Sequence, residues 1–331
     1  MTAFWAAALF LVTGLIFLLP LLPAIVEITR RQDIAPLKIE QDHEGNACYF
    51  AESFRAYIRD AIVNEDARQT FLMGETNELA KLSAQSTGNL IERVVVCDAD
   101  IRMPPSLRFD REVYGAASID GGAGNCYRAV LAEGDLNLAE DTTVLRWAHA
   151  ERISVGANAA LLGRVTAMQS IDIHSPARFK RLHAPIIQFD PPTETIAPTT
   201  RRPEKFSRRV VHGDYHAQAG EHVPDSVVAN GFAVIGSEAV ITGSVKGGSG
   251  VRIESGAAVY GSLVSGQHAD IGGSCTIAGP VIVEGEVVIG RDAIIGNPAN
   301  PTTVTATVIR IQSGARIHGS VWAKECGWVE P

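Results

Sequence analysis

Apolar residues recur at two nested intervals along the C-terminal part of the chain. An isoleucine returns at a constant step of 18, at Ile235, Ile253, Ile271 and Ile289. An aliphatic or small residue also stands at every sixth position of this region: Ala239, Val245, Val251, Ala257, Leu263, Ala269, Cys275, Val281, Val287 and Ala293. Three short strands in each 18-residue coil, each with one inward face, produce both intervals. The pattern predicts an all-β fold, a triangular parallel β-solenoid in which inward residues stack on their equivalents one coil away, at about 4.8 Å.

One longer step and an earlier, less regular stretch extend this repeat. The next step, from Ile289 to Ile311, is longer by four, and the Pro-containing segment 297–303 is expected to hold the extra residues as a loop. Further coils begin at Leu138, Val155 and Ile173, at steps of 17 and 18. We therefore expect an N-terminal solenoid section over residues 100–189 and a C-terminal section over residues 227–325.

The segment between the two sections, residues 190–226, is rich in proline and in basic residues. Its basic residues are Arg201, Arg202, Lys205, Arg208 and Arg209. Proline-rich polar segments are typical of exposed loops and linkers, so we expect a loop here. It serves either as a solvated connector or as a docking segment for acidic lipid headgroups or a partner.

The N-terminus carries an uncharged apolar run over residues 3–26. These 24 residues would be about 36 Å long as a helix, enough to span a hydrocarbon core of about 30 Å. Basic residues follow the run, at Arg30, Arg31 and Lys38, and none precedes it. The positive-inside rule then predicts a single-pass transmembrane helix with the body of the chain in the cytoplasm. A cleaved signal peptide, which would place the body outside, is the alternative.

A helical spacer is expected between this run and the solenoid, within residues 27–99. From residue 46 to about residue 84, apolar Phe50, Phe54, Ile58 and Ile62 recur at a spacing of four. Such a helix either packs as an ordinary element or caps the N-terminal end of the solenoid. At the other end, residues 322–331 are expected to act as a cap, because an uncapped solenoid exposes open strand edges.

Composition and charge narrow the function classes. With 46% apolar and 20% charged residues, the chain is not mainly disordered. A net charge of −8 argues against a nucleic-acid binder. Five cysteines without a CxxC pair indicate neither a disulfide framework nor a structural zinc site. The sequence also lacks the P-loop, GxSxG and HExxH motifs, so we expect no metal, no cofactor and no catalytic constellation.

Four arginines of the N-terminal section recur at coil spacing. Arg128, Arg146, Arg164 and Arg181 follow one another at steps of 18, 18 and 17, which would stack them on successive coils. Two of them are followed by a histidine, His149 and His183. Like charges about 5 Å apart are unfavourable unless they are neutralised. The stripe therefore either pairs with acidic neighbours or binds an anion, and the nearby acids are Glu133, Asp135, Glu140, Asp141 and Glu151.

The repeat resembles that of the bactofilins, the polymer-forming cytoskeletal proteins. The segments that carry the resemblance are ITGSV (241–245), VYGSL (259–263), IAGPV (277–281) and IHGSV (317–321). Bactofilins are bacterial β-solenoids that assemble end to end into filaments and often attach to the inner membrane. The resemblance implies a scaffold at the bacterial inner membrane that organises envelope-building machinery. Its partners would be the lipid bilayer, further copies of the chain or a membrane protein complex.

The period of six also resembles that of the hexapeptide-repeat acyltransferases. VIGSEAVI (234–241) and VVIGRDAIIGN (287–297) are similar to their repeating units. That resemblance implies an enzyme acting on an envelope sugar or lipid, with a histidine as general base. His268 and His318 are the candidates, although neither has a carboxylate nearby in sequence. A glycan- or anion-binding solenoid that uses the arginine stripe is a third interpretation.

Overall fold

The computed structural model describes residues 46–63, 71–73, 89–190 and 207–331, together with a few positions before residue 46. The chain divides into two units, Met1–Asn46 and Ala47–Pro331, and the second contains the solenoid. Most of the apolar run over residues 3–26 lies outside the described residues. Among the residues that are described, no helix is long and apolar enough to cross a membrane.

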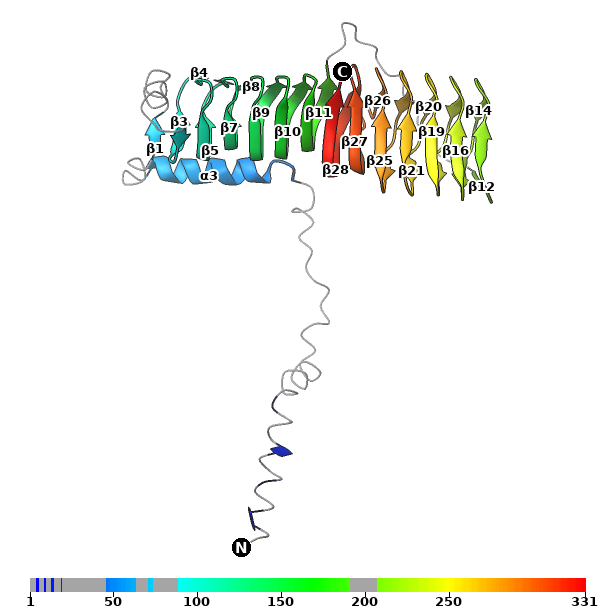
Figure 1. Cartoon of the computed structure of the whole chain (residues 1–331), viewed down its shortest axis with the longest axis horizontal. Helices are drawn as coiled ribbons and strands as arrows, with labels where there is room; N and C mark the ends of the chain where they lie inside the picture. Colours follow the sequence, from blue (N-terminus) through cyan, green and yellow to red (C-terminus); the bar gives the residue numbers. More distant parts are fainter. Residues whose placement is uncertain are drawn as a thin grey trace. The chain divides into compact units, whose positions relative to one another are not determined.

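The second unit is an all-β parallel solenoid in two sections, with one helix at its side (Figure 1). The helix is α3 (Tyr49–Val63). The N-terminal section contains β1 (Phe71–Met73), β2 (Leu90–Ile91), β3 (Val94–Cys97), β4 (Ile101–Arg102), β5 (Arg108–Gly115), β6 (Ile119–Asp120), β7 (Cys126–Ala132), β8 (Asp135–Leu138), β9 (Thr143–Val155), β10 (Ala159–Ile173) and β11 (Ala177–Phe189).

The C-terminal section has the shorter and more regular coils. It contains β12 (Arg208–Val211), β13 (Tyr215–Ala217), β14 (His222–Val223), β15 (Ser226–Ala229), β16 (Phe232–Ile235), β17 (Val240–Ile241), β18 (Val245–Gly247), β19 (Gly250–Ile253), β20 (Ala258–Val259), β21 (Leu263–Ser265), β22 (Ala269–Ile271), β23 (Thr276–Ile277), β24 (Val281–Val283), β25 (Glu286–Ile289), β26 (Ile294–Ile295), β27 (Thr302–Gln312) and β28 (Arg316–Glu330). The first coil, β12–β14, lies inside the range expected as a linker, so this section begins before residue 227.

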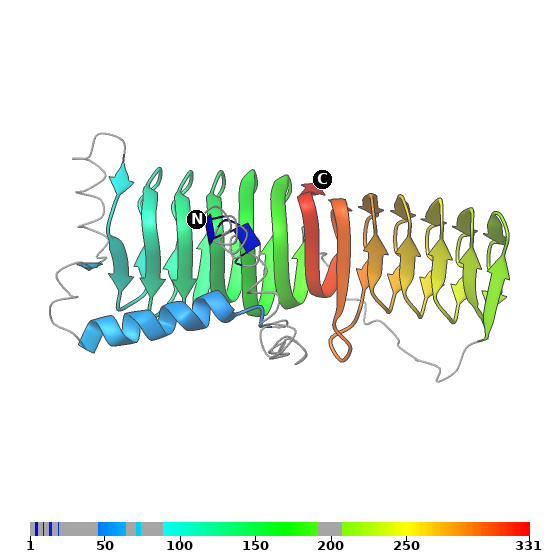
Figure 2. The same ribbon diagram turned by 90° about the horizontal axis from the view of Figure 1, so that it is seen from below.

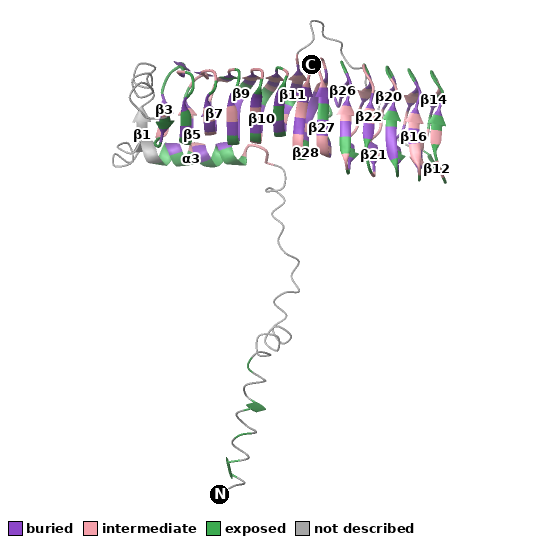
Figure 3. Cartoon of the chain, viewed as in Figure 1, coloured by how far each residue is buried: buried purple, intermediate pink, exposed green. Residues whose placement is uncertain are grey.

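The predicted 18-residue repeat is confirmed by the strand register. Val245 pairs with Leu263 and Leu263 with Val281, each with its equivalent one coil away. All three are fully buried, while Ile282, the next residue after Val281, points outward. The purple positions of Figure 3 follow this alternation along the solenoid. The inward side chains of both sections form one continuous core.

One corner of nearly every coil takes a left-handed backbone conformation. The positions are Asn89, Ser106, Gly124, Asp141 and Asn158 in the first section, and Gly220, Glu238, Gly256, Ser274, Asp292 and Gly314 in the second. A positive φ favours glycine, asparagine and aspartate, which occupy all of these positions except Ser106, Glu238 and Ser274. The step from Asp292 to Gly314 is longer than the others. Its extra residues form the predicted loop, in which Asn297 Oδ1 accepts hydrogen bonds from the amides of Ala299 and Asn300.

The two sections meet end to end, and the chain direction reverses where they meet. Strands are parallel within each section, but β11, from the last coil of the first section, pairs antiparallel with β28, from the last coil of the second. Leu182 pairs with Val321, and Ile187 with Ile317. The sections are therefore stacked into a single 28-stranded sheet. The expectation that residues 322–331 cap a free end is wrong, because β28 lies inside this junction.

Strand register defines three outward faces. The ladder face carries Arg102, Asp120, Asn137, Ser154, Asp172, Gln188, Arg316, Ile294, Thr276, Ala258, Val240 and His222, paired in this order. These twelve rungs correspond to a rod about 50 Å long. The α3 face carries Trp147, Arg164, Arg181, Trp322, Thr305 and Ile282. The third face carries Arg178, Trp328 and Arg310.

Helix α3 lies along the side of the N-terminal section and does not cover its end (Figures 1 and 2). Its apolar side forms a cluster with outward side chains of the strands beneath it: Ala51, Phe54, Ile58, Val96, Ala129, Leu131 and Trp147. Arg55 Nε also donates to both carboxylate oxygens of Glu133, at 2.8 and 2.9 Å. Helix is thus confirmed over 49–63 as a packing helix. The helix that the sequence predicts up to about residue 84 is wrong for residues 71–73, which form β1 and pair with β3.

Candidate functional site

The arginine stripe divides into two parts. Arg164 and Arg181 pair directly on neighbouring strands of the α3 face. The next residues of this column are Trp147 on one side and Trp322 on the other. Arg128 and Arg146 lie one residue out of register, because Trp147 and not Arg146 pairs with Arg164. A spacing of 18 therefore failed to stack all four, since bulges shift the long strands β7, β9 and β10.

The two parts differ in how their charge is balanced. Arg128 Nε lies 3.4 Å from a carboxylate oxygen of Glu112, which was not among the acids expected to pair with the stripe. Within the described ranges, neither Arg164 nor Arg181 forms an ion pair with a carboxylate. Each instead lies over an aromatic ring, Arg164 at 5.4 Å from the centroid of Phe50 and Arg181 at 4.3 Å from that of Trp322. As far as the described residues show, no carboxylate occupies their guanidinium donors, which are suited to binding an anion.

The two predicted histidines lie in the neighbouring column of the same face, in different environments. His149 is 1% exposed beneath α3 and shares a 2.7 Å hydrogen bond between Nδ1 and Thr166 Oγ1. Burial, then the positive charge of Arg55, lowers the pKa of His149 to about 4. His149 is therefore part of the surface on which α3 packs, and it cannot contact a ligand. His183 is half-buried and shares a 2.8 Å hydrogen bond with Ser320 Oγ across the junction. Burial and Arg164 lower its pKa.

The five basic residues of the expected loop fall into two groups. Arg201, Arg202 and Lys205 lie outside the described residues. Arg208 and Arg209 belong to β12, the first strand of the C-terminal section. Arg209 pairs with the buried Val227, so it occupies an inward position at the free end of the rod. It forms an ion pair with Asp225 at 3.5 Å.

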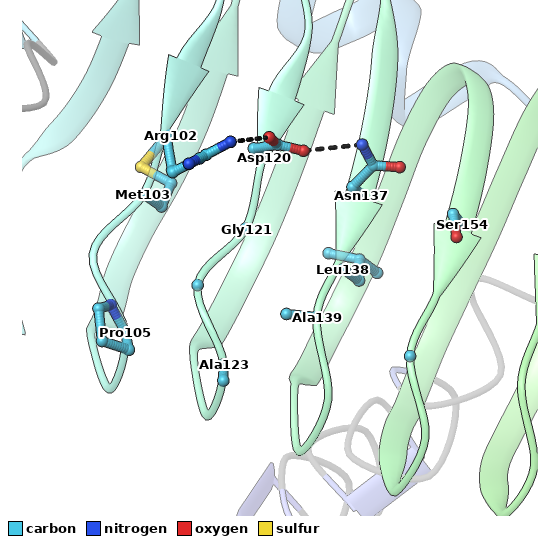
Figure 4. A pocket seen from close by; sticks show the side chains of 12 residues that line it. Arg102, Met103, Pro105, Asp120, Gly121, Ala123, Asn137, Leu138, Ala139 and Ser154 are labelled. Carbon is cyan, nitrogen blue, oxygen red and sulfur yellow. Dashed lines mark hydrogen bonds and ion pairs between the residues drawn. The ribbon is translucent and has the colours of Figure 1, made fainter.

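A shallow groove of about 650 Å³ crosses successive coils of the ladder face (Figure 4). Asp120 lies at its centre, 3.5 Å from Arg102 and 2.7 Å from the amide of Asn137. On the next column Arg152 pairs with Asp135 at 2.9 Å. These side chains form ion pairs and hydrogen bonds with one another. We therefore interpret the groove as a structural feature and not as a ligand site.

The two candidate catalytic histidines are poorly placed for proton transfer. His318 is buried, and its Nδ1 donates to the carbonyl oxygen of Pro185 at 3.0 Å. His268 is exposed beside Phe232, at 5.2 Å between ring centroids, and its imidazole has no hydrogen-bond partner among the described residues. Among all the residues that the structure describes, no group of three or more potential metal ligands is present.

Comparison with known proteins places the chain in no family. It matches no protein-family model, no curated protein and no solved structure. The candidate site therefore stands on its geometry. Arg164 and Arg181, with Trp322 and Phe50 beside them, form a cationic surface next to the junction. Sequence reasoning missed Trp322 and Phe50, because these contacts join segments that are far apart in the chain.

Proposed function

We propose that the protein is a membrane-tethered scaffold at the cytoplasmic face of the bacterial inner membrane. The observation that supports this most is the antiparallel junction between β11 and β28. It joins two short solenoids into one rod with a continuous core, and a rod of this kind offers long, rigid lateral faces to partners.

A discrete rod fits the free end of the C-terminal section better than a filament does. Inward-pointing charged residues are one way in which natural proteins protect an open sheet edge. Arg209, with Asp225, occupies such a position in the first coil of the C-terminal section. End-to-end contact would bury this ion pair and the polar Tyr215 nearby, so stacking of copies at this end is unfavourable.

The tether is inferred from the uncharged run over residues 3–26 and from the basic residues that follow it. The role in organising envelope-building machinery rests on the resemblance to bactofilins. The acyltransferase interpretation has no comparable support, because His318 is buried and His268 lacks a carboxylate partner among the described residues.

The test combines fractionation with electron microscopy. The full chain is expected to stay in bacterial membranes after alkaline carbonate washing, whereas a variant that lacks residues 1–46 is expected to be released. Negative staining of the detergent-purified full chain is expected to reveal single short rods at all concentrations. Release of the full chain by carbonate would refute the tether, and long filaments would refute the discrete scaffold.

A further inference from the structure

The α3 face of the rod continues beyond the helix as an open surface. From Arg164 onward one outward column runs through Arg181, Trp322, Thr305, Ile282, Val264, Lys246, Val228 and Val210. A second column beside it contains Thr166, His183, Ser320, Thr303, Pro280, Ser262, Ser244, Ser226 and Arg208. At the first rung Thr166 is buried and Arg164 lies over Phe50 of α3, but from Arg181 and His183 onward no described residue packs over these columns as α3 packs over the N-terminal section.

Charge distinguishes these two columns from the rest of the rod. They contain four cationic side chains, Arg164, Arg181, Lys246 and Arg208, and no carboxylate. None of the four forms an ion pair within the described part of the chain. The nearby acids Asp225 and Glu284 lie in turns between strands. The chain as a whole has 37 acidic and 29 basic residues, so a face without acids is a marked asymmetry.

The other two faces carry carboxylates among their cations, although Arg178 on the third face lies over Trp328 and Arg316 on the ladder face contacts Gln188, without an ion pair among the described residues. On the third face Arg310 pairs with Glu286 and with Glu330, at 2.6 and 2.7 Å. On the ladder face Arg152 pairs with Asp135. A face that carries cations and no carboxylate is complementary to an anionic surface that is itself extended and flat.

Three large apolar side chains on the same columns are exposed. Val210 is 51% exposed, Ile282 46% and Trp322 42%. Tryptophan, together with arginine and lysine, is typical of the membrane–water interface, where the ring lies among headgroups and the cations attract anionic lipids. Two copies packed face to face would instead gather their cations in one interface to which these columns bring no carboxylate.

The path of the chain leads to the same face. Helix α3 begins at Tyr49 on this side of the rod, where Phe50 lies under Arg164. Only residues 27–46 separate the start of the solenoid unit from the apolar run 3–26. A tether of this length holds the α3 face at high local concentration near whatever surface the run occupies.

We propose that the open part of the α3 face, from Arg164 to Val210, lies against the surface of a bilayer that contains anionic lipids. This inference rests on the proposed membrane tether. The four cations attract the headgroups, and Trp322, Ile282 and Val210 contact the interface. The rod then lies flat and presents its ladder face and third face to partners.

The first coil of the C-terminal section offers a matched pair of reporters. Val210 and His216 are both exposed, but Val210 lies on the α3 face and His216 on the third face. Full-length Val210→Cys, Ile282→Cys and His216→Cys variants are placed in nanodiscs of phosphatidylcholine, with or without phosphatidylglycerol. Modification by a polar maleimide is followed by peptide mass spectrometry, with the detergent-solubilised protein as reference.

Modification of Val210→Cys and Ile282→Cys is expected to slow at least about tenfold in discs with phosphatidylglycerol, since each cation near an anionic surface contributes roughly fivefold. His216→Cys is expected to react as in detergent. Combined Arg164→Glu, Arg181→Glu and Lys246→Glu substitutions are expected to abolish the protection. Equal modification rates at all three positions would overturn the proposal. Slow modification of Val210→Cys and Ile282→Cys already in detergent would also overturn it, because protein and not lipid would then cover the face.

Failure of the tether gives a different result. A full chain that does not enter discs and is released by carbonate refutes the proposed anchor only. The same labelling, with phosphatidylglycerol vesicles added to that protein, still measures whether the α3 face contacts lipid. Absence of protection by the vesicles refutes the present inference.

Discussion

Gly327 lies at the point where the two sections meet, and its replacement by alanine tests the junction. It pairs with Phe179 of β11, and an added Cβ would overlap Cε2 and Cζ of that ring. Phe179 is buried and packs against Phe189 at 6.1 Å between centroids, so the ring has little room to move. Overpacking of this kind costs about 1–3 kcal/mol. We therefore expect the equilibrium constant for local opening of the junction to rise about 5- to 150-fold.

Amide hydrogen exchange measures this opening strand by strand, which suits a solenoid whose coils need not unfold together. Faster exchange is expected in β11 and β28 of Gly327→Ala and not in β16–β20. Gly273→Ala is the matched control, because its Cβ would meet only the carbonyl oxygen of Arg291, at 3.3 Å. If the two variants exchange alike in β11 and β28, Gly327 does not face Phe179 and the antiparallel register is wrong.

Three further predictions concern α3 and the free end. Phe54→Ala removes a ring 8% exposed that lies 5.6 Å from Trp147, and exchange in α3 is expected to rise by about two orders of magnitude, whereas the exposed Ser53→Ala leaves it near wild type. The lowered pKa of His149, about 4, means that the unfolded state binds more protons below pH 6.5, so about 2–3 kcal/mol of stability is lost as the pH falls from 6.5 to 4. His149→Gln is expected to flatten this pH dependence in urea unfolding, and an unchanged profile would contradict the assignment. Arg209→Val is expected to dimerise in light scattering because it leaves an apolar end over Val227, while Arg208→Val, which faces outward, stays monomeric.

The sequence was most informative where one residue type serves one repeated environment. The aliphatic column that includes Val245, Leu263 and Val281 specified the coil length and the inward face of the C-terminal section, because a side chain at a given position of the coil meets the same neighbours in every coil. The extra loop near Asn297 was visible for the same reason, as a break in an otherwise constant step.

The candidate site was only partly visible. The Arg164–Arg181 pair follows from coil spacing, but Arg146 falls out of register because a bulge adds a residue to one strand and shifts every outward position after it. The sequence suggests His149 as a ligand-facing residue, yet it is buried because α3 covers it. No local pattern reports which surface a distant helix will cover.

By itself the sequence determined the coil: its period and its inward residues. Tertiary structure alone decided how the coils are joined. The reversal at β11 and β28 depends on which two open edges meet, and the backbone groups of an edge carry no sequence signature of their partner. The same holds for the open α3 face. Its four cations come from β10, β11, β12 and β18, and they become one surface only once the two sections are stacked.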